Sequence, residues 1–263
     1  MTKTHTFEGA AHALRAHRLG GDANIAAVAA LIGDEARAAM LLALGTGRPL
    51  SASELAALAR VRPQTASSHL AKLVRGSLLH VERQGRFRYY RVANPDVAAA
   101  IEALGVIAPT KRVRALGATI KQQALRLART CYDHLAGRLG VALFQALVER
   151  DALCELDRID PSQRKRRSAL GAVALGPRAA AVFGDLGIDL EELRSAHRQF
   201  APACLDWTET EPHLGGSLGA ALCCAFFEND WCRHRPRLRA VTLTDRGRHA
   251  LRERFGIELD RGS

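Results

Sequence analysis

The sequence predicts a mainly α-helical protein with small β-wings, in which an N-terminal winged helix-turn-helix is followed by a helical C-terminal domain. One architecture that we consider for the C-terminal domain is a pair of further winged-helix-like halves. Three observations lead to this prediction. The 263 residues are 48% hydrophobic but only 5% aromatic, and Ala and Leu recur throughout, which favours packed helices over a β-sandwich. Apolar residues recur at helical spacing in the first hundred residues. Two β-type runs joined by a Gly-containing turn follow these helices.

The first hundred residues predict four helices, and three of them have their own start signal. Apolar residues form one helix face over residues 24–32, and Asp34 is the expected N-cap of the second helix. Ser51 and Glu54 form a capping box at the start of the third helix. Pro63 fits the first turn of the fourth helix. The short third and fourth helices, separated by a tight break, predict a helix-turn-helix.

The fourth helix has an apolar face and a polar face. Ala66, Leu70 and Leu73 lie on the apolar face. The other face carries small hydrogen-bonding side chains, which suit the base edges and phosphates of the DNA major groove. The side chains of this helix that we expect to contact DNA are Gln64, Thr65, Ser67, Ser68, His69 and Lys72.

The predicted wing is a hairpin of residues 78–81 and 87–92 with Gly85 in its turn. Arg83 and Arg86 near its tip are expected to contact an adjacent groove or the DNA backbone. A formal net charge of +11 agrees with a nucleic-acid partner, although charge alone is a weak signal. Winged helices also serve as docking modules, so an architectural or protein-docking role without effector control is the alternative function.

Residues 25–104 resemble the ArsR-type winged-helix repressors of bacteria, above all in the segments SASELAALARVRPQTASSHLAKLV and GRFRYYRVANPDVAAAIEAL. The resemblance implies a homodimer that reads a palindromic operator in double-stranded DNA and leaves it when an inducer binds. Family members that bind metal before the recognition helix carry two Cys there, whereas this chain has Ala56 and Leu58. The helix after the wing offers only Asp96 and Glu102 as ligands. Sensing at the familiar metal sites of the family is therefore not expected.

We expect two domains: residues 1–107 for DNA binding and dimerisation, and residues 108–263 for effector sensing. The apolar helices over residues 24–32 and 94–104 flank the motif and are the predicted dimer seam. No run of about 18 uncharged apolar residues occurs and the N-terminus lacks a signal segment, so we expect a soluble cytoplasmic protein without membrane contact.

The C-terminal domain is expected to contain helices over residues 113–128 and 132–150 and a mobile basic loop over residues 160–168. It also contains a weak internal repeat, in which residues 173–179 resemble residues 241–247. Each copy is predicted to be a strand that enters a helix.

Two segments of this domain are dense in polar and aromatic residues, and together they resemble the C-terminal domain of a long subgroup of ArsR-type regulators. They are RTCYDHLAGRLGVAL and CLDWTETEPHLGGSLGAAL. The resemblance indicates where a sensing site would lie in the chain but does not identify its ligand. The candidate effector or sensor residues are Cys131, Tyr132, His134, Cys204, Asp206, Trp207 and His213.

The expected chemistry of these segments centres on Cys131. Thr130 is the expected N-cap of a helix that begins near Cys131, where the helix dipole and cationic neighbours lower a thiol pKa. Cys131 is therefore expected to be the most reactive thiol. His134 would share the helix face of Cys131, and the two residues could ligate one metal ion together with Cys204 and His213.

Four interpretations of these segments remain open. A metal site requires the two Cys and two His side chains near a common point, and a redox pair requires the Cα atoms of Cys131 and Cys204 about 4.4–6.8 Å apart. A small-molecule organic effector requires a cavity walled by Tyr132 or Trp207. The fourth interpretation is a purely structural seam. The cofactor is therefore unknown; none is expected to be required for DNA binding, and a metal ion is one candidate.

The sequence does not favour an enzyme. It contains no nucleophile elbow, phosphate-binding loop, paired carboxylates or credible oxyanion element. Six cysteines in a chain of this size predict thiols rather than a disulfide scaffold. We expect a transcriptional regulator, specifically a repressor whose operator binding is relieved by an effector or a thiol modification sensed in the C-terminal domain.

Overall fold

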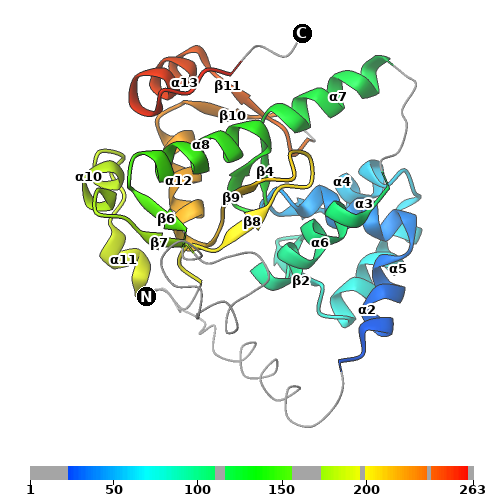
Figure 1. The fold of residues 1–263 in the computed structure, drawn as a ribbon. Coiled ribbons are helices and arrows are strands. Elements are labelled where there is room, and N and C mark those ends of the chain that lie inside the picture. Colours follow the sequence, from blue (N-terminus) through cyan, green and yellow to red (C-terminus); the bar gives the residue numbers. More distant parts are fainter. Residues whose placement is uncertain (1–22, 110–115, 156–172, 196–198, 236–237, 260–263) are drawn as a thin grey trace.

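The structure is a computed structural model that describes residues 23–109, 116–155, 173–195, 199–235 and 238–259 (Figure 1). One hydrophobic core gathers buried residues between Met40 and Ile101, and a second gathers buried residues between Ala128 and Ile257. None of the described helices combines the length and apolar character needed to cross a membrane. The basic loop predicted over residues 160–168 lies outside the described residues.

The first core is covered by the expected helices. They are α2 (Ile25–Ile32), α3 (Glu35–Leu44), α4 (Ala52–Leu58), α5 (Pro63–Arg75) and α6 (Pro95–Ile107). The start signals act as predicted: the side chain of Asp34 accepts a hydrogen bond from the amide of Arg37, and Ser51 and Glu54 form both bonds of a capping box. Leu55 and Leu70 are fully buried, so α4 and α5 pack their apolar faces on one core.

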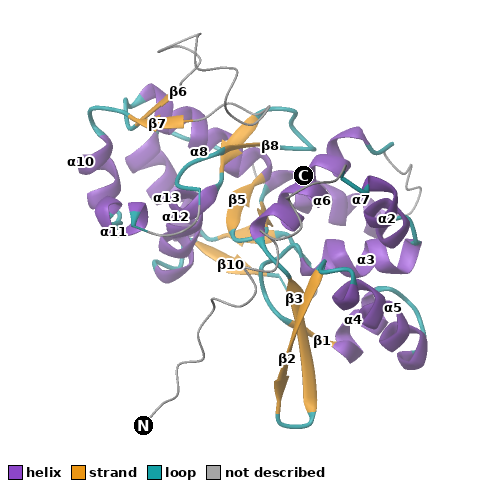
Figure 2. Cartoon of the chain, turned by 90° about the horizontal axis from the view of Figure 1, so that it is seen from below, coloured by secondary structure: helices purple, strands orange, loops and turns teal. Residues whose placement is uncertain are grey.

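The wing is a long antiparallel hairpin of β2 (Leu79–Gln84) and β3 (Phe87–Val92), and β1 (Leu50–Ser51) pairs with the other edge of β3. Figure 2 shows the hairpin standing out from the body of the molecule beside α4 and α5. These elements confirm the predicted winged helix-turn-helix.

The second core is built from two halves with the same order of elements: a hairpin, a long helix, a second hairpin and a short helix (Figure 1). The first half contains β4 (Arg129–Cys131), β5 (His134–Ala136), α8 (Gly137–Glu149), β6 (Leu153–Glu155), β7 (Val173–Leu175) and α10 (Ala179–Gly184). The second half contains β8 (Ala203–Leu205), β9 (Pro212–Leu214), α12 (Gly216–Glu228), β10 (Cys232–His234), β11 (Val241–Leu243) and α13 (Asp245–Ala250).

Three further helical segments complete the described chain. They are α7 (Leu116–Leu127), α11 (Leu190–Arg194) and a single π-helical turn, η2 (Leu251–Phe255), that continues α13. The predicted repeat is present, because β7 leads into α10 and β11 leads into α13. The duplication is more extensive than that repeat, since α8 and α12 each have 13 residues and each follows a hairpin directly.

The helix predicted over residues 132–150 is wrong at its start. Cys131 pairs with His134 across a tight hairpin, and Tyr132 in the turn has a φ of +60°. A positive φ is incompatible with a right-handed helix, so the chain turns back on itself and α8 begins only at Gly137. Thr130 and Cys131 are strand residues and not the start of a helix.

Candidate functional site

The first candidate site is the outer face of α5. Gln64, Thr65, Ser67, Ser68 and Lys72 are all exposed on this helix. The structure thus leaves these five side chains available to a partner. The wing residues Arg83 and Arg86 are exposed too, toward the tip of the β2–β3 hairpin.

His69 is less exposed than these five residues of α5. Its ring is half-buried, with Nδ1 3.6 Å from Oδ1 of Asp34 and 3.4 Å from a guanidinium nitrogen of Arg37. These contacts place the ring of His69 against the start of α3. The sequence had placed His69 on the exposed face.

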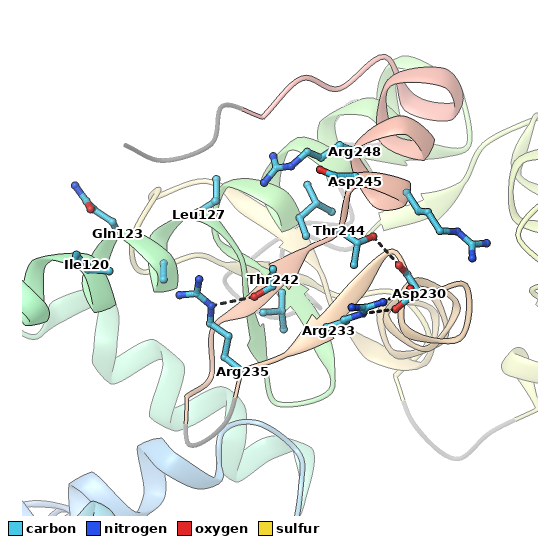
Figure 3. A pocket seen from close by; sticks show the side chains of 14 residues that line it. Ile120, Gln123, Leu127, Asp230, Arg233, Arg235, Thr242, Thr244, Asp245 and Arg248 are labelled. Carbon is cyan, nitrogen blue, oxygen red and sulfur yellow. Dashed lines mark hydrogen bonds and ion pairs between the residues drawn. The ribbon is translucent and has the colours of Figure 1, made fainter.

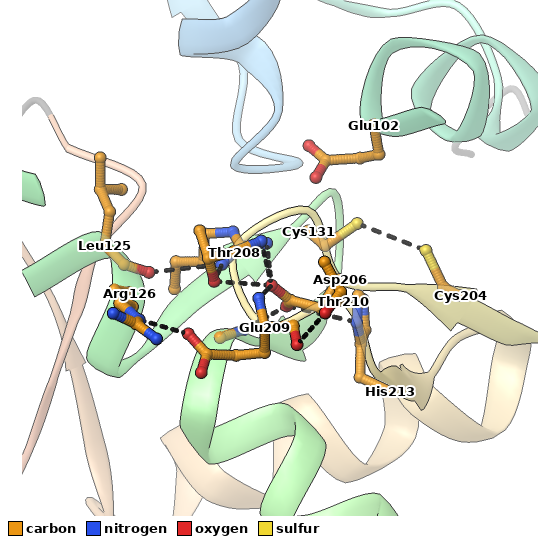
Figure 4. Close-up of polar contacts among 12 residues, drawn as sticks. Glu102, Leu125, Arg126, Cys131, Cys204, Asp206, Thr208, Glu209, Thr210 and His213 are labelled. Atoms are coloured by element: carbon orange, nitrogen blue, oxygen red, sulfur yellow. Dashed lines mark hydrogen bonds and ion pairs between the residues drawn. The ribbon is translucent and has the colours of Figure 1, made fainter. Parts of the chain in front are cut away.

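The second candidate site lies where the two hairpins β4–β5 and β8–β9 meet. Cys131 faces His134 across the first hairpin, and Cys204 faces His213 across the second. The structure brings one ligand atom from each of these four residues to within 4.8 Å of the others. We call these four residues the Cys2His2 cluster. Figure 4 shows the sulfurs of Cys131 and Cys204 pointing toward one another, 3.9 Å apart.

Two glycines lie where the two halves meet at the cluster. A Cβ atom on Gly140 of α8 would lie 3.4 Å from Cβ of His213, and one on Gly219 of α12 would lie 3.2 Å from Cβ of His134. Each histidine therefore packs against a glycine of the other half. The ring centroids of the two histidines are 5.1 Å apart, so the cluster lies at the junction of the two halves.

A carboxylate lies beside one nitrogen of each histidine ring. Nδ1 of His134 is 3.4 Å from Oδ1 of Asp133, and Nδ1 of His213 is 3.4 Å from Oδ2 of Asp206. In both rings Nε2 is buried without a hydrogen-bond partner. The two rings thus share Nδ1 near a carboxylate and a buried Nε2 without a partner, but only Nδ1 of His134 is within hydrogen-bond geometry of its carboxylate; Nδ1 of His213 forms no hydrogen bond.

Asp206 is the centre of a buried polar network (Figure 4). It accepts hydrogen bonds from the amides of Gly137 and Thr208, and its Oδ1 is 3.0 Å from a guanidinium nitrogen of Arg129. The side chains of Arg129 and Asp206 are both fully buried. Arg129 also lies over the ring of Trp207, 4.7 Å from its centroid. The network fixes the β8–β9 hairpin against β4 and the start of α8.

Burial and the neighbouring charges shift the pKa values in the cluster. The hydrogen bond with Cys204 and burial raise the pKa of the Cys131 thiol well above its ordinary value. Burial opposes the charged form of His134, but the cysteine thiolate and Asp133 outweigh it and raise its pKa to about 9. Burial and the charge of His134 hold the pKa of His213 well below its ordinary value.

The expectation that Cys131 has a lowered pKa is therefore wrong, and the prediction that it is the most reactive thiol loses its physical basis. That basis was a helix N-terminus that the structure replaces with a hairpin, and the thiol is buried. Among the six free cysteines, Cys224 is exposed.

The Cys2His2 cluster is in contact with the winged helix through the β4–β5 turn. The amide of Tyr132 donates a hydrogen bond of 2.8 Å to the carbonyl of Gly45, at the end of α3. Gly47 has a φ of +70°, and a Cβ atom there would lie 2.7 Å from the carbonyl oxygen of Tyr132. The turn thus fits directly into the loop between α3 and the helix-turn-helix.

A buried ion pair forms a second contact between the two cores. Arg239 pairs with Glu102 of α6 at 2.5 Å, and its Nε donates to the carbonyl of Thr130 in β4. Trp207 provides a third contact, because a Cβ atom on Gly105 of α6 would lie 3.4 Å from its Cγ. Sequence reasoning treated Glu102 only as a ligand candidate and missed Arg239, whose role depends on a contact between distant segments.

A cavity lies elsewhere in the described part of the chain. It is an open groove of about 820 Å³ between α7 and the β10–β11 hairpin (Figure 3). Arg233, Arg235, Arg248 and Ile120 contribute to its lining, which contains neither Tyr132 nor Trp207. The organic-effector interpretation required a cavity walled by one of those two aromatic residues, and this groove does not provide it.

The comparisons with known proteins agree with the first site. A family model described as a helix-turn-helix domain matches residues 32–82. The chain is 39% identical over 236 residues to the HTH-type transcriptional regulator YdfF of Bacillus subtilis (strain 168), covering 90% of this chain and 99% of that protein. The chain belongs to the HTH-type transcriptional regulators. The alignment extends through the C-terminal region, so this regulator and its relative share the long form.

Solved structures similar to this regulator match only a part of it. HlyU from Vibrio cholerae N16961 is 24% identical, with 32% of this chain and 89% of that chain covered and a TM-score of 0.29. A homodimeric winged helix-turn-helix DNA-binding domain from Mycobacterium bovis is 25% identical, with 34% and 89% covered and a TM-score of 0.30. The family assignment confirms the predicted transcriptional regulator with a helix-turn-helix DNA-binding domain.

Proposed function

We propose that this regulator is a cytoplasmic, homodimeric repressor that binds a palindromic operator and whose DNA binding is relieved by an event at the Cys2His2 cluster. In this proposal residues 1–107 bind DNA and dimerise, and residues 108–263 sense the signal. The observation that carries the proposal is the β4–β5 turn, which holds Cys131 and His134 at its base and contacts the loop before the helix-turn-helix at Gly45 and Gly47. A change at the cluster can therefore reach the DNA-binding elements through the single β4–β5 hairpin.

DNA binding is assigned to α5 and the wing. The exposed hydroxyls of Ser67 and Ser68 and the amide of Gln64 are hydrogen-bonding groups of the size that major-groove recognition needs. Arg83 and Arg86 on the exposed hairpin supply positive charge for phosphate contacts. His69, half-buried against Asp34, is assigned to positioning α5 on α3 rather than to base contact.

Replacing Ser68 by Ala is expected to weaken binding to the operator by about 1–3 kcal/mol while leaving non-specific binding unchanged, because a base contact is lost.

The double replacement of Arg83 and Arg86 by Ala should instead weaken binding to all sequences and reduce the slope of log affinity against log salt by about 1 per lost phosphate contact. Fluorescence anisotropy with an operator selected from genomic fragments measures both.

Arg178→Ala is the matched control for the wing arginines, since Arg178 is exposed on the C-terminal half, just before α10. Its affinity and salt slope should equal those of the wild type. If the Ser67→Ala, Ser68→Ala and wing variants all keep the affinity and sequence preference of the wild type, α5 and the wing are not the DNA-binding surface.

The homodimer is assigned to the apolar residues that α2 and α6 leave exposed. Ile25 is 74% exposed and Ile107 is 78% exposed, with Val28 and Leu104 also uncovered. Isolated exposed apolar residues are common, but these four flank the helix-turn-helix on the two helices at its ends. A single recognition helix covers one half-site, so a second copy on this seam supplies the other half.

Replacing Ile25 and Ile107 together by Asp is expected to convert a dimer into a monomer at micromolar concentration, because two charges per protomer would be buried in the seam. Sedimentation velocity measures the change. Ile120→Asp is the matched control, since Ile120 is an exposed isoleucine on α7. A wild-type chain that sediments as a monomer and still binds its operator as a monomer would eliminate the dimer.

A further inference from the structure

We propose that Cys131, His134, Cys204 and His213 bind one divalent metal ion of the borderline to soft class in a tetrahedral site, with Zn²⁺ as its representative. The inference deepens the proposed function, on which it rests, by naming the chemical class of the signal. The four residues come from two hairpins that the duplicated fold brings together, and Cys and His are the ligand types that such ions select.

The geometry of the cluster is close to that of a tetrahedral centre. Bonds of about 2.0–2.3 Å from a central ion place four tetrahedral ligand atoms roughly 3.3–3.8 Å apart. The sulfurs of Cys131 and Cys204 are 3.9 Å apart, and all four ligand atoms lie within 4.8 Å of one another. Small side-chain rotations therefore suffice to bring the four atoms to coordination distance.

The two histidines are oriented as metal ligands are. A metal-bound imidazole typically has its second nitrogen beside a carboxylate or carbonyl, which fixes the ring and raises its basicity. Asp133 lies beside Nδ1 of His134 and Asp206 beside Nδ1 of His213. Nε2 of each ring is buried without a hydrogen-bond partner, an arrangement that costs free energy unless something binds there. A metal ion satisfies both Nε2 atoms at once.

The charges in and around the cluster are compatible with a bound divalent ion. An ion of charge +2 bound by two thiolates and two neutral imidazoles has no net charge, which lowers the cost of burying it. Binding requires both thiols to lose their protons and both imidazoles to be neutral, so every proton carried by the four side chains is released to solvent. The other buried charges are already matched, Arg129 with Asp206 and Arg239 with Glu102. The cluster therefore has no need of a further counterion.

The alternative use of these cysteines, a reversible disulfide, explains less of the structure. The two sulfurs are 3.9 Å apart, a non-bonded distance that fits two reduced thiols and that small rotations could close to a bond of about 2.05 Å. A disulfide between Cys131 and Cys204 involves neither histidine, and it leaves both Nε2 atoms without a partner. It is therefore an outcome that the experiment must distinguish.

The test is a titration of the reduced, metal-free full-length chain with Co²⁺, followed by displacement with Zn²⁺. We expect one equivalent of Co²⁺ to give the visible bands of a tetrahedral ion and the near-ultraviolet bands of cobalt–thiolate bonds, and one equivalent of Zn²⁺ to remove them. Cys204→Ser should weaken binding by more than the 10–100-fold that loss of an outer-shell partner costs. Cys224→Ser, which changes an exposed cysteine outside the cluster, should bind like the wild type.

Cys131→Ser is a second ligand variant, and thermal melting of both variants checks that they fold. Absence of cobalt–thiolate bands in the wild type, or equal affinity in the folded Cys204→Ser variant, overturns the inference. A Cys131–Cys204 disulfide formed under mild oxidation, in a chain that binds no metal, overturns it in favour of a redox pair. DNA binding by the metal-free chain is measured separately, so the Ser68 and wing variants test the DNA-binding surface whether or not the chain binds a metal ion.

Discussion

Replacing Asp206 by Ala should destabilise the C-terminal core by about 3–5 kcal/mol, because it leaves the guanidinium of Arg129 buried without its counterion. Both side chains are fully buried, and Asp206 also accepts hydrogen bonds from the amides of Gly137 and Thr208. The carboxylate therefore cannot be replaced by water without opening the hairpin. The same change removes the carboxylate that lies 3.4 Å from Nδ1 of His213.

Urea unfolding followed by tryptophan fluorescence measures this loss, since Trp207 and Trp231 are the two tryptophans of the chain and both lie in the C-terminal region. Asp185→Ala is the control, because Asp185 is exposed at the end of α10. Its free energy of unfolding should stay within about 0.5 kcal/mol of the wild type. An Asp206→Ala variant as stable as this control would contradict the role assigned to the network.

Replacing Gly219 by Ala should cost about 3 kcal/mol, at the upper end of the range for overpacked cores. The added Cβ would lie 2.3 Å from the carbonyl oxygen of Leu214 and 3.2 Å from Cβ of His134. The first contact is with the backbone at the end of β9, which cannot rotate away, and the second is with β5, so α12 would have to shift against both strands. Because His134 belongs to the cluster, the same variant should also bind Co²⁺ more weakly.

Gly184→Ala is the matched control at a helical glycine. A Cβ there meets nothing within 4 Å, and Ala favours a helix by up to about 1 kcal/mol over Gly. We therefore expect this control to be unchanged or slightly more stable in the same urea titration. Equal stability of the Gly219→Ala and Gly184→Ala variants would mean that α12 and β5 are not as close as the structure places them.

The winged helix was predictable because its signals are local. Asp34, Ser51 and Pro63 mark helix starts within one turn of the chain, and the structure contains each helix where these signals place it. The hairpin of β2 and β3 follows from two β-type runs around Gly85. His69 departed from the expectation because its orientation depends on Asp34, which lies on another element.

The hairpin that holds Cys131 was not predicted because a helical pattern of apolar residues begins directly after it. Extending that pattern backwards gives a helix over Tyr132, whereas Tyr132 adopts a left-handed turn whose amide bonds to the distant Gly45. A signal was present in the sequence: HLAGRLG begins at His134 and HLGGSLG at His213. Two copies of one histidine-to-helix joint indicate two equivalent hairpins, each with a cysteine facing the histidine.

In the proposed function, a change at the Cys2His2 cluster controls DNA binding by α5 and the wing. This control is tested by the affinity of the reduced full-length chain for its selected operator, measured by fluorescence anisotropy before and after one equivalent of Zn²⁺. We expect at least a tenfold loss of affinity in the wild type, within the usual range of coupling between two sites, and no change in the Cys204→Ser variant. Equal operator affinity of the wild type with and without bound Zn²⁺ would contradict it.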